Sequence, residues 1–89
     1  MKAIFKYPLE IKDEQQIEMY AHAFILSVKE QNNEIVLYAK ISHEEEKKEM
    51  RTIYIFGTGH DIPNTLNAYF LDTVMTNGGR LVWHIFVKN

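Results

Sequence analysis

Apolar and polar residues alternate with a period of two along most of this chain, which is the pattern of β-strands. The clearest case is residues 24–41, FILSVKEQNNEIVLYAKI, where an alternating run stands on each side of Asn32 and Asn33. Because asparagine tolerates the positive φ angles of a type I′ turn, this stretch predicts a β-hairpin. Residues 73–87 repeat the arrangement around a Thr-Asn-Gly-Gly turn, so we expect a second hairpin there.

Two further strands are predicted from shorter apolar runs. Residues 3–7 form an opening strand, and Pro8 places its end at a sheet edge or a bend. Residues 50–56, MRTIYIF, form a central strand that leads into a glycine-containing loop. The charged stretch 42–50, SHEEEKKEM, is expected to be a solvated, mobile connection.

Two segments fit a helix and a strand equally well. In residues 13–24, Asp13 is a candidate N-cap for a short helix, but the same residues also alternate as a strand. In residues 64–75, Asn64 is a candidate N-cap and apolar residues recur at helical spacing, with Gly78 placed to end the helix. The spacing of apolar residues alone does not decide between the two structures in either segment.

The strands and turns together predict one all-β domain covering residues 1–89. Turns recur about every ten residues, which is typical of a small antiparallel sandwich or a partly open barrel of about six or seven strands, with at most one short helix. The content of 46% hydrophobic residues is sufficient for a packed core. A chain of this size buries only about 60% of its unfolded surface, so we expect it to gain stability as a homo-oligomer.

Charge and composition argue against several kinds of partner and compartment. The net charge is −2 and the lysines are dispersed, so nucleic acid is not an expected partner. The chain has no cysteine, which excludes disulfides and cysteine-ligated zinc and fits a reducing compartment. There is no signal-peptide pattern and no membrane-spanning run, so we expect a cytoplasmic protein without membrane contact. The dispersed lysines include Lys2, Lys6, Lys12 and Lys29.

The stretch YIFGTGHDIP, residues 54–63, is the candidate binding loop. Gly57, Thr58 and Gly59 follow a predicted strand, and successive backbone N–H groups in such a loop can bind an anion. His60 adds an imidazole that can form a charge-assisted hydrogen bond or act as an acid or base. The loop lacks the lysine of a P-loop and the third glycine of a dinucleotide fingerprint. The alternative is a bulge or tight bend that needs positive φ at both glycines.

The last predicted strand supplies the candidate partners of this loop. Arg80 and His84 lie on one face of it, and Arg80 is suited to hold a phosphate or carboxylate through two hydrogen bonds. Tyr54 and Trp83 are the candidates for stacking on a base. If the loop and the strand meet, His60, Arg80 and His84 form one ligand site. The alternative is that His84 is a core histidine bonded to a backbone carbonyl.

The sequence lacks the patterns of the common catalytic and metal sites. His60 and His84 are the candidate acid and base of a nuclease, with Arg80 as charge stabiliser, but neither stands in a His-x-Thr or His-x-Ser motif. Ser27 and Ser42 lack a nucleophile-elbow sequence. No two histidines have metal-site spacing. We therefore expect no catalytic residue, metal or cofactor, and keep a histidine-based nuclease or phosphodiesterase as the alternative.

Three blocks of the chain resemble one known family. FKYPLEIKDEQQIEM at the start, RTIYIFGTGHDIP in the centre and GGRLVWHIF at the end are similar to blocks shared by short proteins from tailed-phage and prophage genomes. The blocks occur in the same order as in that family and cover nearly the whole chain. The chain departs from the family pattern at Asp61 and at Tyr20, since the family usually has proline at both places.

The resemblance implies an all-β fold in which both ambiguous segments are mainly strands or loops. It also implies a phage protein in the cytoplasm of an infected host cell, and it assigns no activity. Small phage proteins of this kind often work by stoichiometric binding of nucleotide immune signals or of a host protein. Our first hypothesis is a non-catalytic, homo-oligomeric module that captures a small phosphate-bearing ligand such as a nucleotide. The alternative is a protein-binding inhibitor of a host factor or a virion-associated structural component.

Overall fold

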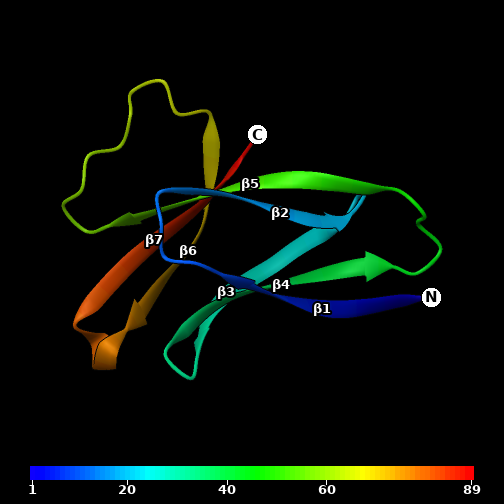
Figure 1. Cartoon of the computed structure of the whole chain (residues 1–89), viewed down its shortest axis with the longest axis horizontal. Helices are drawn as coiled ribbons and strands as arrows, with labels where there is room; N and C mark the ends of the chain where they lie inside the picture. Colours follow the sequence, from blue (N-terminus) through cyan, green and yellow to red (C-terminus); the bar gives the residue numbers. More distant parts are fainter.

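Two antiparallel sheets packed face to face make up the protein (Figure 1). The computed structural model describes all of residues 1–89. The strands are β1 (Lys2–Leu9), β2 (Glu14–Tyr20), β3 (Phe24–Gln31), β4 (Glu34–Ser42), β5 (Lys48–Gly57), β6 (Ala68–Thr76) and β7 (Leu81–Lys88). One sheet has the strand order β1-β4-β3, the other has the order β2-β5-β7-β6, and a short 3₁₀ turn, η1 (Asn77–Gly79), joins β6 to β7.

The alternating apolar residues lie on the facing sides of the two sheets and form the core. In β4, every second residue from Ile35 to Ile41 is buried, and in β5 Ile53 and Ile55 are buried as well. Burial of one such side chain contributes about 1.5–3 kcal/mol, so this alternation holds the sheets together. The all-β prediction is confirmed, and the open sheets make it a sandwich. The core consists of Leu9, Met19, Ala23, Val28, Ile35, Leu37, Ala39, Ile41, Ile53, Ile55, Val74, Ile85 and Val87.

Local turn chemistry accounts for both predicted hairpins. Asn32 and Asn33 join β3 to β4 with φ angles of 53° and 65°, as a type I′ turn requires. Between β6 and β7, residues 77–79 also have positive φ angles, which glycine adopts without strain. Both hairpin predictions are confirmed.

Both ambiguous segments contain strands, and the helical interpretation of each is wrong. Within residues 13–24, β2 pairs with β5 along its whole length and buries Met19. Within residues 64–75, the chain enters β6 and pairs with β7, apart from a register shift between Phe70 and Asp72. Pairing with a neighbouring strand decides the structure, because it buries every second residue instead of every third or fourth. No helix of the structure is long and apolar enough to cross a membrane.

Two strand boundaries differ from their predicted positions. The charged connection is shorter than residues 42–50, because β5 already begins at Lys48. The ammonium of Lys48 lies 4.4 Å from the centre of the Tyr20 ring, a cation–π contact that holds the start of β5 against the end of β2. The opening strand continues through Pro8, which is tolerated because β1 is an edge strand without a partner on that side.

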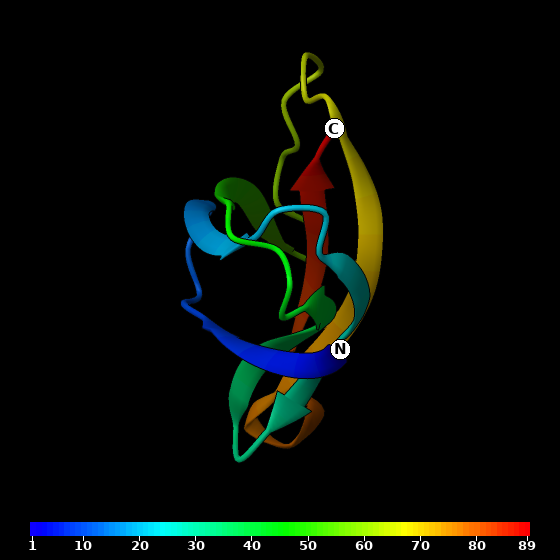
Figure 2. The same ribbon diagram turned by 90° about the vertical axis from the view of Figure 1, so that its right-hand side faces the viewer.

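The two sheets also contact each other along the edges formed by β3 and β6. Asp72 accepts a hydrogen bond from the backbone N–H of Val28 at 3.3 Å and forms an ion pair with Lys29 at 3.5 Å. At the same side of the sandwich, the turn residues Asn33 and Asn77 hydrogen-bond to each other. Figure 2 shows both turns at one end of the molecule, while the loop between β5 and β6 extends to the other end.

Candidate functional site

The candidate loop and the last strand lie side by side. Gly57, at the end of β5, pairs with Trp83 of β7. The contact continues into the loop, where the N–H of Thr58 donates to the carbonyl of Val82 at 3.2 Å. The two segments therefore meet, as a shared site requires.

A shallow cavity of about 180 Å³ lies between the loop and β7, and we call it the Arg80 pocket. It brings together five of the predicted site residues, and Gly59 adjoins it in the loop. The Arg80 side chain is exposed and forms no ion pair within the chain. The pocket is lined by Gly57, Thr58, His60, Arg80, Leu81, Val82 and Trp83.

His60 folds back over Gly57. A β-carbon at position 57 would lie 2.9 Å from Cε1 of the imidazole, so glycine leaves room for the ring. The N–H of His60 donates to the carbonyl of Gly57 at 3.0 Å, which closes a β-turn. Gly59 is the third residue of this turn and has a φ of 88°, whereas Gly57 has no positive φ. The predicted bend exists, but the prediction of positive φ at both glycines is wrong.

The loop backbone offers fewer free donors than predicted. The N–H groups of Thr58 and His60 are occupied by the carbonyls of Val82 and Gly57. The predicted cradle of successive amide groups around an anion is therefore not formed. An anion in the Arg80 pocket has to be held mainly by the side chains of Arg80 and His60.

His84 does not line the Arg80 pocket. Its Nε2 is 2.7 Å from Oγ1 of Thr58, and its Nδ1 is 3.1 Å from Oγ1 of Thr73. Because a hydroxyl both donates and accepts, these two bonds satisfy the imidazole without a ligand. The prediction that His60, Arg80 and His84 converge is wrong for His84, and so is the alternative of a carbonyl-bonded core histidine. Instead, His84 braces the loop against β6 and β7.

The two predicted stacking residues lie in different cavities. Trp83 lines the Arg80 pocket, and its indole N–H donates to Oγ1 of Thr76 at 2.9 Å. This bond and the packing of the ring on the core fix the orientation of the indole. Tyr54 instead lines a second cavity, which is larger than the Arg80 pocket. Of the two rings, only Trp83 is placed to contact a ligand in the Arg80 pocket.

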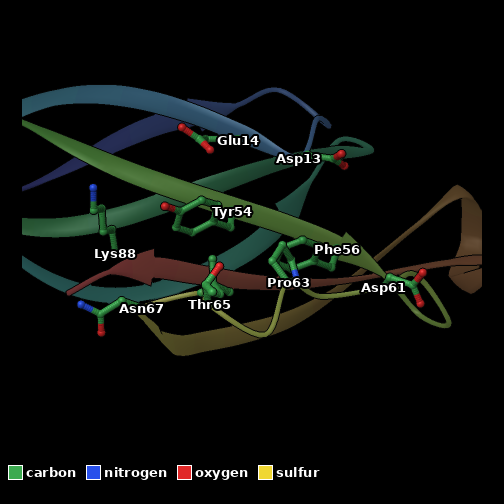
Figure 3. Close-up of a pocket in the computed structure, with 10 residues that line it drawn as sticks. Asp13, Glu14, Tyr54, Phe56, Asp61, Pro63, Thr65, Asn67 and Lys88 are labelled. Carbon is green, nitrogen blue, oxygen red and sulfur yellow. The ribbon is translucent and has the colours of Figure 1, made fainter.

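The larger cavity, of about 430 Å³, is absent from the sequence-based predictions, and we call it the Tyr54 cavity. Figure 3 shows Tyr54 and Phe56 beside the loop residues Pro63 and Thr65. The two aromatic rings are stacked, with 6.4 Å between their centres. Their two-residue spacing on a strand is the sequence signal for this wall, but the return of the loop has no local signal. The cavity is lined by Asp13, Glu14, Tyr54, Phe56, Asp61, Pro63, Thr65, Leu66, Asn67 and Lys88.

Acidic residues dominate the charge around the Tyr54 cavity. Asp13, Glu14 and Asp61 form no ion pair within the chain, and Lys88 is the only cationic residue of the lining. An excess of negative charge repels a phosphate-bearing ligand. Of the two cavities, only the Arg80 pocket therefore has the charge that an anionic ligand needs.

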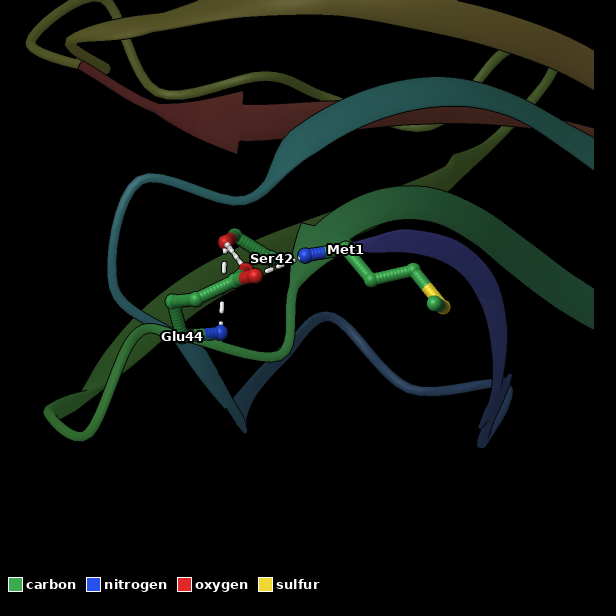
Figure 4. A network of polar contacts seen from close by, with 3 residues as sticks. All are labelled: Met1, Ser42 and Glu44. Carbon is green, nitrogen blue, oxygen red and sulfur yellow. Dashed lines mark hydrogen bonds and ion pairs between the residues drawn. The ribbon is translucent and has the colours of Figure 1, made fainter.

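Shifted pKa values occur at Glu44 and Tyr7, and both residues lie outside these cavities. Hydrogen bonds from the N-terminal amine of Met1 and from the hydroxyl of Ser42 lower the pKa of Glu44 to about 2 (Figure 4). Burial, with a smaller effect of Tyr20, raises the pKa of the Tyr7 phenol. No group of three or more His, Cys, Asp or Glu residues is arranged to hold a metal ion.

Comparison with known proteins assigns the chain to a family. A family model described as "Domain of unknown function (DUF7352)" matches residues 1–89, the whole chain. The chain belongs to the DUF7352 family. No curated protein and no solved structure matches it. For this DUF7352 protein, membership supports the expectation of a family with no assigned activity, so a function has to be inferred from the site itself.

Proposed function

We propose that this DUF7352 protein is a non-catalytic binding module for a small phosphate-bearing ligand, with the Arg80 pocket as its site. One observation carries the proposal: the unpaired guanidinium of Arg80 shares a cavity with His60 and Trp83. A guanidinium holds a phosphate through two parallel hydrogen bonds, an imidazole adds a donor, and an indole covers an apolar ring. A nucleotide carries both the phosphate and the ring that these groups suit.

The size of the Arg80 pocket limits how one chain holds such a ligand. Its volume of about 180 Å³ is below the roughly 300–1,000 Å³ of typical ligand sites. One chain therefore encloses the phosphate and part of the adjoining ring, and the rest of a nucleotide stays outside. A second copy of the chain would supply the missing wall, which agrees with the homo-oligomer expected for a domain of this size.

The arrangement of the histidines favours binding over catalysis. Acid–base chemistry on a phosphodiester uses two positioned groups, and both ring nitrogens of His84 are already bonded to Thr58 and Thr73. His60 is then the one histidine at the Arg80 pocket. The alternative function, a histidine-based nuclease or phosphodiesterase, predicts turnover of RNA or a nucleotide that is lost in His60→Ala.

We place this function in the cytoplasm of an infected host cell, where the protein sequesters a nucleotide immune signal. Support for this setting comes from the resemblance of three sequence blocks to proteins of tailed phages and prophages. Sequestration needs binding without turnover, and it removes one signal molecule for each site. The proposed chemistry of the Arg80 pocket meets that requirement.

Calorimetric titration tests the proposed function. The protein is titrated with inorganic phosphate and with a panel of linear and cyclic nucleotides. We expect binding that weakens about tenfold or more in Arg80→Ala, because a hydrogen bond to a charged group contributes about 1.5–3 kcal/mol. Arg80→Lys recovers only part of the loss, since lysine lacks the planar fork. Lys47→Ala, a charge-matched change in the connection before β5, is the control. No heat with any ligand, or equal effects of Arg80→Ala and Lys47→Ala, contradicts the proposal.

A second candidate function is protein binding through the outer side of β6 and β7. Phe70 and Met75 are 54% and 55% exposed there, and Phe70 packs edge-to-face on Phe86 with 5.6 Å between ring centres. An exposed apolar sheet face marks an interface. We call it the aromatic face, and apart from His84 and, at one end, Lys88, its outward residues carry no acidic or basic group. They are Ala68, Phe70, Thr73, Met75, Val82, His84, Phe86 and Lys88.

We assign the aromatic face to a second copy of the chain. A mainly apolar surface with few charges can pair with a second copy of itself across a two-fold axis. Light scattering over a range of concentrations is expected to show a dimer that becomes a monomer in Phe70→Glu with Met75→Glu. Ile4→Glu, an exposed apolar position on the other sheet, is the control. A monomer at all concentrations contradicts the assignment, and stoichiometric capture of a host protein by this face would favour the inhibitor hypothesis instead.

A further inference from the structure

The outer side of the three-stranded sheet collects lysines that are far apart in the sequence. Lys2 and Lys6 lie on β1, Lys40 on β4 and Lys29 on β3. The strand register places Ile4 opposite Lys40 and places Lys40 opposite Phe24, so that these side chains form one row across the sheet. The alternate residues of these strands, such as Phe5, Ala39 and Ile41, lie in or against the core. We call this surface the lysine face.

The charge of the lysine face is opposite to that of the chain as a whole. The protein has 12 acidic residues against 10 lysines and arginines, yet Glu34 is the one acidic residue at an outward position of these three strands. Lys29 is paired with Asp72, whereas the other three ammonium groups form no ion pair. Three unpaired cations on one sheet side make a local positive field that the net charge of −2 conceals.

Exposed apolar side chains stand between these cations. Ile4 and Phe24 are 63% and 64% exposed, and the ammonium of Lys40 lies 5.7 Å from the centre of the Phe24 ring. Tyr38, on the central strand, is half-buried and donates its hydroxyl proton to the side-chain oxygen of Gln31 at 3.2 Å. A shallow cavity of about 260 Å³ adjoins the Phe24 ring. It is lined by Lys2, His22, Phe24, Lys40, Ile41 and Ser42.

We propose that the lysine face binds single-stranded nucleic acid. Lys2 and Lys6 are four residues apart on one strand, about 13 Å, so they contact different phosphates. The cavity beside Phe24 takes a base, which stacks on the ring while Lys40 contacts a phosphate next to it. Sheets that carry cations and aromatic rings on one side bind single strands in this way, because unpaired bases expose their faces for stacking.

This proposal departs from the expectation that nucleic acid is not a partner. Lysines dispersed between positions 2 and 40 give no basic cluster in the sequence. They converge only because β1 and β3 both pair with β4. The lysine face lies on the three-stranded sheet, whereas the Arg80 pocket lies on the four-stranded sheet. Each proposal can therefore be tested without the other.

Fluorescence anisotropy with labelled oligouridylate and oligothymidylate tests the inference. We expect binding at low salt, with a slope of log K against log salt near −2 for three phosphate contacts. Lys6→Gln and Lys40→Gln each reduce the slope by about 0.7. Phe24→Ala weakens binding about five- to hundredfold through lost stacking. Lys47→Gln is the charge-matched control, and it should leave binding unchanged.

Two results would overturn the inference. One is the absence of an anisotropy change at low salt with either oligonucleotide. The other is equal binding by the wild type and by Lys40→Gln and Phe24→Ala, with circular dichroism showing that the variants are folded. Vesicles containing phosphatidylserine form a parallel arm. Binding to these vesicles without binding to oligonucleotides would assign the lysine face to an anionic membrane surface instead.

Discussion

The imidazole of His60 occupies the space that a side chain at position 57 would fill. A β-carbon on Gly57 would lie 2.9 Å from Cε1 and 3.0 Å from Nδ1 of that ring. Since Gly57 has no positive φ, its backbone conformation is open to any residue. The glycine is therefore required by the position of His60 in the Arg80 pocket and not by the turn.

We expect Gly57→Ala to displace the His60 ring while the protein remains folded. The ring is the exposed end of a flexible side chain, so its movement costs less than about 1 kcal/mol of stability. Ligand affinity at the Arg80 pocket falls about two- to tenfold, because one hydrogen bond contributes about 0.5–1.5 kcal/mol. Thermal unfolding and calorimetry on the same variant measure the two effects.

The double variant Gly57→Ala with His60→Ala provides the control for this prediction. If Gly57 acts through His60, adding Gly57→Ala to His60→Ala causes no further loss of affinity. Additive losses in the double variant would show that Gly57 contributes to the pocket in another way.

The side chains of Asn33 and Asn77 predict a second, purely structural effect. The Asn33 amide donates to Oδ1 of Asn77 at 2.9 Å, and its oxygen accepts from the Asn77 N–H at 2.7 Å. We expect Asn33→Gly to lower the free energy of unfolding by about 1–2 kcal/mol through loss of both bonds. Asn33→Ala costs about 1–2 kcal/mol more, because φ at this position is 65°. Urea unfolding compares the variants, and equal effects of the two would contradict the role of φ.

We expect the loop to open locally when the hydrogen bonds of His84 are lost. Removing its bonds to Thr58 and Thr73 with His84→Ala is expected to reduce stability by about 1–3 kcal/mol. Amide hydrogen exchange should speed up at Thr58 and His60 before it does in the core strands. Thr73→Val, which removes one of the two bonds, should give a smaller effect in the same direction. Uniform acceleration over the whole chain would argue against a local brace.

Glu44 predicts a pH dependence at the acidic end of the scale. Its folded-state pKa of about 2 lies below the ordinary value of 4.5, so its contacts stabilise the fold above pH 4.5. This contribution is lost as the pH falls from 4.5 towards 2, and solvent screening keeps it small because the carboxylate is exposed. NMR titration of the Glu44 carboxyl carbon measures the pKa directly. Ser42→Ala should raise the pKa of Glu44. An unchanged pKa would show that the Ser42 hydroxyl does not contribute to the shift.

Local patterns were sufficient for some parts of the fold and insufficient for others. The Asn32-Asn33 hairpin follows from turn chemistry within a few residues, so the sequence predicts it correctly. The segments 13–24 and 64–75 contain apolar residues at both helical and strand spacing. Pairing with β5 and β7, which are distant in sequence, decides that they form strands. Such pairing has no local signal.

The candidate site could likewise be predicted from the sequence only in part. That the glycine loop meets β7, the strand that follows Arg80, is a consequence of β5–β7 pairing, and the sequence-based hypothesis named both segments. The partners of His84 were not predictable, because Thr73 reaches it only across the register shift in β6. The lysine face was missed for a related reason, since lysines on separate strands come together only once the register of the sheet is known.

Two-dimensional ¹H–¹⁵N NMR during titration with cyclic and linear nucleotides tests the central claim most directly. It reports separately on the Nε–H of Arg80 and the indole N–H of Trp83. We predict that both signals shift along one saturable curve with the bound nucleotide, and that the shifts disappear in Arg80→Ala. Saturable shifts confined to residues of the lysine face or the Tyr54 cavity, or no shift with any ligand, would contradict the Arg80 pocket as the binding site.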